Sequence, residues 1–147
     1  MNRETILSAI IEEQEKVISN LQETISNYEN AADIDEDSTI DTDDLSQQAQ
    51  SKDMQMRFES LLKDAKNDLI YLKNIIAEQH TQIEKGSIVE TDKNILFIGI
   101  SVPKFRFQDN EVISFSDEAP VFEDIKDKKQ GDDMKIGNLS LKIRTIC

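Results

Sequence analysis

The first 85 residues contain neither glycine nor proline, whereas all four glycines and both prolines lie between Gly86 and the C-terminus. Glycine and proline are the residues that most readily interrupt a helix. Apolar residues recur at spacings of three and four from Leu7 to Tyr28 and again from Phe58 to Ile83. This pattern predicts two long amphipathic helices. Because neither helix can bury its apolar stripe alone, we expect an antiparallel coiled-coil hairpin over residues 1–85.

Residues 86–147 predict a small β-rich domain, which makes the expected fold class α+β. The boundary follows Lys85-Gly86, a basic last helical turn and the glycine that favours helix ends. A short helix is expected over Pro120–Lys126, with the proline in its first turn. The β-prone segments, most of them separated by turn residues such as Gly137-Asn138, are Ser87–Thr91, Ile95–Ser101, Phe105–Phe107, Val112–Phe115, Met134–Ile136 and Leu139–Ile146.

The chain is strongly acidic, with 30 acids, 17 bases and a formal net charge of −13. Residues 1–85 hold 19 of the acids and 8 of the bases. This charge disfavours direct binding to nucleic acid or to an anionic membrane, and it favours a basic protein partner. The longest apolar runs fall far short of the roughly 20 residues that span a membrane. With Cys147 as the single cysteine and no secretory pattern, we expect a cytoplasmic protein.

Negative charge is densest where the hairpin must turn, in an expected tip loop of about residues 31–48. No Lys or Arg occurs between Lys16 and Lys52, and seven acids fall within residues 33–44. Carboxylates so close together repel one another, by about 1 kcal/mol per pair at 4 Å in water. Three interpretations are open: a solvated acidic loop, a calcium site, or carboxylates presented to a hard cation such as Mg²⁺ that is held elsewhere.

The calcium interpretation rests on the oxygen-bearing residues of the segment 33–44. They fall at the first, third, fifth, seventh, ninth and twelfth positions of an EF-hand loop. Two positions depart from that motif. Ser38 stands where the sharp turn requires glycine, and Asp44 stands where a longer glutamate normally binds Ca²⁺ through both oxygens.

The segment from Ala119 to Asp132 resembles the "SPIG-x-ALLGKKVGD" signature of the bacterial Gre transcription factors. Asp127 and Gln130 depart from the family's usual glycine and valine. Gly86–Thr91 and the closing segment up to Ile146 lie where that family has the first and last strands of its FKBP-like domain. The matching residues are Pro120, Val121, Ile125, Lys128, Lys129, Gly131 and Asp132.

The resemblance implies an RNA polymerase partner and no catalytic activity of the chain's own. Gre factors bind the polymerase through the C-terminal domain and insert the coiled coil into its secondary channel. Their tip carboxylates there help to hold a second catalytic Mg²⁺ for cleavage of backtracked transcripts. The family's Asp-x-x-Glu pair is closest to Asp41 and Asp44 here, with aspartate replacing glutamate and a different sequence following. Asp43, Asp37 and Asp35 would then supply supporting charge.

The polymerase-binding residues that the resemblance suggests are Pro120, Lys126, Lys128, Lys129 and Asp132. A relative that enters the channel and regulates without cleavage would carry much the same sequence. A coiled-coil adaptor whose acidic tip contacts a basic partner is the other alternative. His80, expected on the second helix, has no cysteine or second histidine near it in sequence and predicts an ordinary surface residue.

Overall fold

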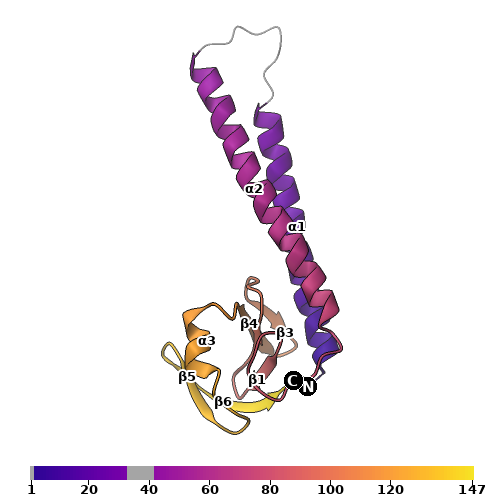
Figure 1. The fold of residues 1–147 in the computed structure, drawn as a ribbon, viewed down its shortest axis with the longest axis vertical. Coiled ribbons are helices and arrows are strands. Elements are labelled where there is room, and N and C mark those ends of the chain that lie inside the picture. Colours follow the sequence, from indigo (N-terminus) through magenta and orange to yellow (C-terminus); the bar gives the residue numbers. More distant parts are fainter. Residues whose placement is uncertain (1, 33–41) are drawn as a thin grey trace. The chain divides into compact units, whose positions relative to one another are not determined.

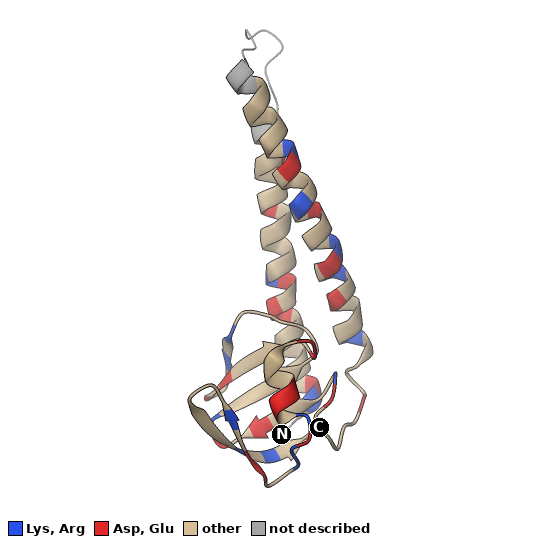
Figure 2. Ribbon diagram, turned by 60° about the vertical axis from the view of Figure 1, so that its left-hand side comes forward, with Lys and Arg blue, Asp and Glu red and all other residues tan. Residues whose placement is uncertain are grey.

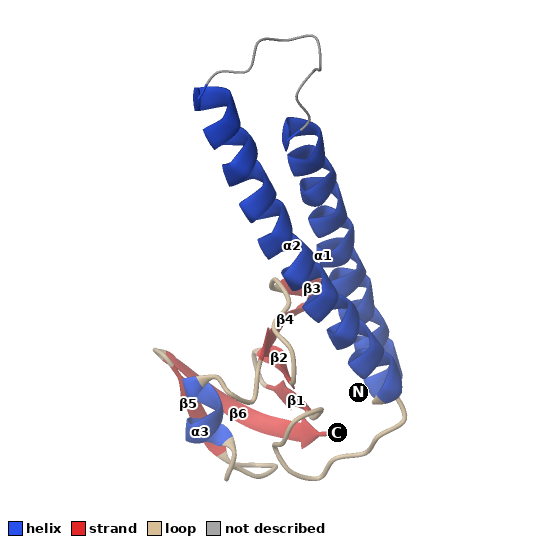
Figure 3. Cartoon of the chain, turned by 45° about the horizontal axis from the view of Figure 1, so that its top comes forward, coloured by secondary structure: helices blue, strands red, loops and turns tan. Residues whose placement is uncertain are grey.

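The computed structural model describes residues 2–32 and 42–147. Two long helices, α1 (Arg3–Ala32) and α2 (Thr42–Asn74), precede six strands and one short helix (Figure 1). The protein therefore belongs to the α+β class, as predicted. The later elements, seen in Figure 3, are β1 (Ile88–Thr91), β2 (Asn94–Ile98), β3 (Phe105–Phe107), β4 (Asn110–Phe115), α3 (Pro120–Ile125), β5 (Asp133–Ile136) and β6 (Leu139–Ile146).

The chain forms two compact units that do not coincide with the helices and the strands. One unit combines Met1–Glu13 with Tyr71–Cys147, and the other is Gln14–Ile70. The first turns of α1 and the end of α2 therefore belong to the same unit as the sheet. The boundary expected between residues 85 and 86 lies inside this unit.

A single six-stranded sheet organises the first unit, in the order β3-β4-β2-β1-β6-β5. Strands β2 and β4 run parallel, and all other neighbours run antiparallel. The first and last strands, β1 and β6, lie side by side, with Val89 opposite Ile146. Both faces of β2 are covered, since all five of its residues are buried. This explains the uninterrupted apolar run of residues 95–98, which is typical of a central strand.

Alternate residues of the central strands serve two separate hydrophobic clusters. Phe97 packs in one cluster with residues of α1 and α2 that include Leu7 and Leu72. Leu96 and Ile98 pack in the other, with the fully buried Ile125 of α3. Because side chains alternate across a strand, the two clusters lie on opposite faces of the sheet.

The second helix ends at Asn74, so the prediction that it continues to Lys85 is wrong. No glycine or proline stops it. Ile75 is buried in the cluster that contains Phe97, and Ile83 in the cluster on the other face of the sheet. A continuous helix could not deliver both side chains to opposite faces of one sheet. Tertiary packing therefore overrides the helical pattern of residues 75–85.

The second unit contains two paired antiparallel segments of α1 and α2. The buried Gln14 donates from Nε2 to the Ala65 carbonyl at 2.9 Å. Tyr28 stacks on Phe58 with the ring centroids 5.6 Å apart. Tyr28 is four residues from the end of α1, whereas Phe58 is sixteen from the start of α2. On the loop side of the stacked rings, α2 is therefore about three helical turns longer than α1. Residues 42–48 of the expected tip loop belong to this helix.

Candidate functional site

The predicted metal-facing aspartates fall at or beyond the limit of what the structure describes. Asp35, Asp37 and Asp41 lie outside the described residues. Asp43 and Asp44 fall in the first turn of α2, and their side chains also lie outside the described part. The geometry of this carboxylate set therefore stays a prediction. In residues 2–32 and 42–147, no group of three or more His, Cys, Asp or Glu side chains could hold a metal ion.

The Lys-Lys-x-Gly-Asp motif forms a tight turn between α3 and β5. The Asp132 carboxylate accepts the backbone N–H of Lys129 at 2.8 Å, and the Asp132 N–H donates to the Lys129 carbonyl at 2.9 Å. Gly131 has a φ of +90°, a conformation that favours glycine. The Gly131 N–H donates to the Ile143 carbonyl of β6 at 2.8 Å. The glycine and the aspartate of the motif thus have structural roles in the turn.

The remaining predicted partner-binding residues lie before and within this turn. Pro120 is exposed in the first turn of α3, where its fixed φ suits a helix start. Lys126 pairs with Glu123 at 2.8 Å, and this hydrogen bond raises the pKa of the lysine. Lys129 is exposed and Lys128 is half-buried. The chain therefore presents Lys129 to solvent, whereas Lys126 already has a carboxylate partner.

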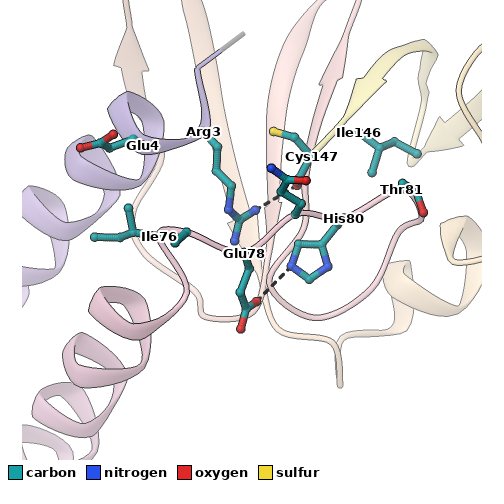
Figure 4. Close-up of a pocket in the computed structure, with 10 residues that line it drawn as sticks. Arg3, Glu4, Ile76, Glu78, His80, Thr81, Ile146 and Cys147 are labelled. Atoms are coloured by element: carbon teal, nitrogen blue, oxygen red, sulfur yellow. Dashed lines mark hydrogen bonds and ion pairs between the residues drawn. The ribbon is translucent and has the colours of Figure 1, made fainter.

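An open groove of about 490 Å³ lies in the first unit, where the start of α1 meets the segment that follows α2 (Figure 4). Arg3 lies beside it and is buried. The guanidinium donates to the Ile75 carbonyl from Nη2 at 2.9 Å and from Nε at 3.3 Å, and to the Cys147 carbonyl from Nη1 at 3.0 Å. Burial lowers the pKa of Arg3. Its donors are spent on backbone carbonyls, so Arg3 links the chain segments that line the groove.

His80 also lines the groove, and the prediction that it lies on the second helix is wrong. It follows the end of α2, and its side chain is only 10% exposed. The Nδ1 atom lies 2.8 Å from a Glu84 carboxylate oxygen, and the Nε2 atom lies 3.1 Å from a Glu78 carboxylate oxygen. Figure 4 shows the contact with Glu78 as a dashed line. Both ring nitrogens have a carboxylate neighbour, and these two contacts fix the orientation of the ring.

The Thr81 hydroxyl and Cys147 also line the groove. Burial raises the pKa of the Cys147 thiol, and the reactive form of cysteine is the thiolate. The hydrogen bonds of Arg3 join the start of α1 to Ile75 and Cys147, so the groove lies at a structural junction.

Sequence reasoning did not single out the junction formed by Arg3, Ile75 and Cys147. One signal was present: Arg3 occupies the first turn of α1, where the helix dipole disfavours a cation. An arginine at such a position indicates a partner outside its own helix. Its acceptors, 72 and 144 residues away, could not be read from the sequence.

Comparisons of the chain with protein-family models, with curated proteins and with solved structures find no match. Among the described residues, no helix is both long and apolar enough to cross a membrane.

Proposed function

We propose that this chain is a cytoplasmic accessory factor of RNA polymerase, of the Gre type, which helps the polymerase to cleave backtracked transcripts. In this proposal the C-terminal domain docks on the polymerase and the acidic end of the helical hairpin enters the secondary channel. The chain supplies carboxylates to the active site of the polymerase and has no catalytic activity of its own. The proposal extends the sequence resemblance in residues 119–132.

The observation that best supports it is the antiparallel pairing of α1 and α2 in the helical unit. The Gln14–Ala65 hydrogen bond and the Tyr28–Phe58 stack hold the two helices together. The segment 33–41, which is rich in acids, joins the paired helices in sequence. A hairpin is suited to this role because stiff helices can carry charged groups away from a docking domain.

The chemistry of the predicted donor set fits Mg²⁺. The candidates in residues 35–44 are all aspartates, and carboxylate oxygens are the ligands that hard divalent cations prefer. We expect Asp41 and Asp44 to face the metal. When bound, Mg²⁺ would supply positive charge to phosphoryl transfer at the polymerase active site. The part of this chain is to hold carboxylates there without binding the ion tightly on its own.

The test uses stalled, backtracked elongation complexes and measures the rate of transcript shortening. We expect the wild-type protein to accelerate cleavage and the pair of changes Asp41→Asn and Asp44→Asn to reduce that rate by about 10²-fold, a typical loss for a missing electrostatic group. The matched control changes Asp53→Asn and Asp64→Asn, two exposed acids of α2. This control removes the same charge and should keep the wild-type rate.

Polymerase binding is measured separately, so that docking and cleavage can be distinguished. The changes Lys128→Glu and Lys129→Glu should weaken binding, whereas Lys135→Glu, at an exposed position of β5, should leave it unchanged. Binding with no effect on cleavage would indicate a channel regulator that does not stimulate hydrolysis. If the protein neither binds the polymerase nor alters cleavage, the proposal is wrong.

A further inference from the structure

Helix α2 carries a second, outward-facing stripe within the helical unit. Leu45, Met56 and Ile70 are 53%, 68% and 59% exposed. Met56 follows Leu45 by eleven residues, and Ile70 follows Met56 by fourteen. These spacings are close to three and four helical turns, so the three side chains align within about 40° around the helix axis. Lys52 and Lys63 fall in the same alignment and are exposed. We call these five residues the outer stripe of α2.

The outer stripe is distinct from the face of α2 that packs against α1. That packed face includes Phe58 and the buried Ala65. Met56 is two residues from Phe58, which places it about 160° away around the helix. The stripe is therefore an additional apolar face that the pairing of the hairpin does not use.

The two lysines give the stripe a positive character on a strongly acidic chain. Neither Lys52 nor Lys63 forms an ion pair with any residue in the described part of the chain. Helix α2 carries six acids and five bases, and Figure 2 shows both kinds along it, whereas α1 carries six acids against two bases. From Leu45 to Ile70 the stripe is about 38 Å long at 1.5 Å per residue. Its order is apolar, Lys, apolar, Lys, apolar.

From this pattern we propose that the outer stripe of α2 is a docking surface for an acidic amphipathic helix of another protein. Such a helix would place apolar side chains against Leu45, Met56 and Ile70, and carboxylates against Lys52 and Lys63. A second copy of this chain fits less well. If two stripes paired antiparallel with Leu45 opposite Ile70, Lys52 of one copy would face Lys63 of the other, and the like charges would repel. Nucleic acid fits less well, because phosphates are contacted by basic and polar groups and three of the five residues of the stripe are apolar. The inference is independent of the proposed function.

The test measures binding of the full chain to a labelled synthetic helical peptide of about 25 residues, the length that matches the stripe. The probe carries Leu in a heptad seam flanked by Glu, and a second probe has Gln in place of every Glu. Fluorescence anisotropy should show that the Glu probe binds at least about tenfold more tightly than the Gln probe, although the chain and the Glu probe are both acidic and repel each other overall. Equal or tighter binding of the Gln probe would overturn the proposal.

Two matched variants locate the site. Met56→Glu should weaken binding of the Glu probe about tenfold or more, because it removes an apolar contact and adds a like charge. Leu61→Glu introduces the same residue at a 51% exposed position on another side of α2 and should bind as the wild type does. Glutamate is a good helix former, and circular dichroism should confirm unchanged helicity in both variants. Equal weakening by the two variants would contradict the proposal.

Sedimentation velocity of the free chain completes the test. We expect a monomer at all concentrations at which the probe binds. A dimer that Met56→Glu abolishes and Leu61→Glu preserves would show that a second copy occupies the stripe, and it would overturn the assignment to an acidic partner.

Discussion

The link from Arg3 to the end of α2 and to the last residue predicts a large effect of a single substitution. The two shorter bonds of the guanidinium, to the carbonyls of Ile75 and Cys147, measure 2.9 and 3.0 Å. Hydrogen bonds from a charged donor contribute about 1.5–3 kcal/mol each. Each carbonyl also keeps a backbone donor, from Glu78 or Ile88, so neither is left unsatisfied. We therefore take the lower value for each bond and expect Arg3→Ala to cost about 3 kcal/mol.

Urea unfolding measures this cost in the unit that contains the sheet. The chain has two tyrosines, Tyr28 in the helical unit and Tyr71 in the unit of Arg3. In a Tyr28→Phe background, fluorescence of Tyr71 reports unfolding of the sheet unit. With a slope of about 1–3 kcal/mol per molar urea, a loss of 3 kcal/mol lowers the midpoint by at least about 1 M. The slope itself should not change, because the exposed surface on unfolding is the same.

The matched control is Arg106→Ala, which removes an exposed arginine from the short edge strand β3. Surface substitutions of this kind usually stay within about 0.5 kcal/mol of wild type. Arg3→Lys should recover only part of the loss, because an ammonium lacks the planar fork that reaches two acceptors. If Arg3→Ala and Arg106→Ala unfold at the same urea concentration, Arg3 does not hold this junction together.

Three further predictions concern the turn, the alkaline limit and the helix pair. Gly131→Ala should destabilise the sheet unit by about 1–2 kcal/mol in urea unfolding. The cause would be backbone strain alone, because a Cβ at this position meets nothing within 4 Å. An unchanged stability would contradict the strained conformation of Gly131 in the turn. Burial raises the pKa of Tyr71 above 10.0 and that of Cys147 above 9.0. Raised values mean that their contribution to stability is complete below about pH 9 and declines as the pH rises through their folded pKa values. Unfolding free energies measured against pH should therefore decline less in Tyr71→Phe and Cys147→Ser proteins, and an unchanged decline would refute this. Gln14→Ala should cost about 2 kcal/mol by thermal unfolding, whereas Gln14→Met, which keeps the volume, should cost less than about 1 kcal/mol. Equal losses of stability in the two variants would mean that the volume of the side chain at position 14 does not contribute.

The strands and α3 could be predicted closely because local chemistry marks their ends. Gly137-Asn138 joins β5 to β6, and Gly137 indeed has a positive φ of 59°. Pro120 begins α3, as the position of the proline predicted. Turns of this kind depend on residues next to each other in the chain, so their signal is present in the sequence.

The end of α2 could not be predicted, because residues 75–85 keep helical spacing and contain no breaker. What ends the helix is the burial of Ile75 and Ile83 in clusters on opposite faces of the sheet and the bonds from Arg3. These contacts join residues far apart in sequence. The same reason hid the full surroundings of His80, because a helix would bring Glu84 onto the same face as His80 but would place Glu78 on the opposite side.

The most direct test of the proposed function asks whether the acidic segment reaches the catalytic centre of the polymerase. Because Cys147 is the only cysteine, a Cys147→Ser background allows an iron chelate to be tethered at one chosen site, through Asp37→Cys. In a backtracked elongation complex, hydroxyl radicals from this tether should cut the transcript near its 3′ end. The same tether at Leu61→Cys, an exposed position on α2, should leave that end intact. Equal cutting from both tethers, or cutting from neither while the protein remains bound, would contradict the account.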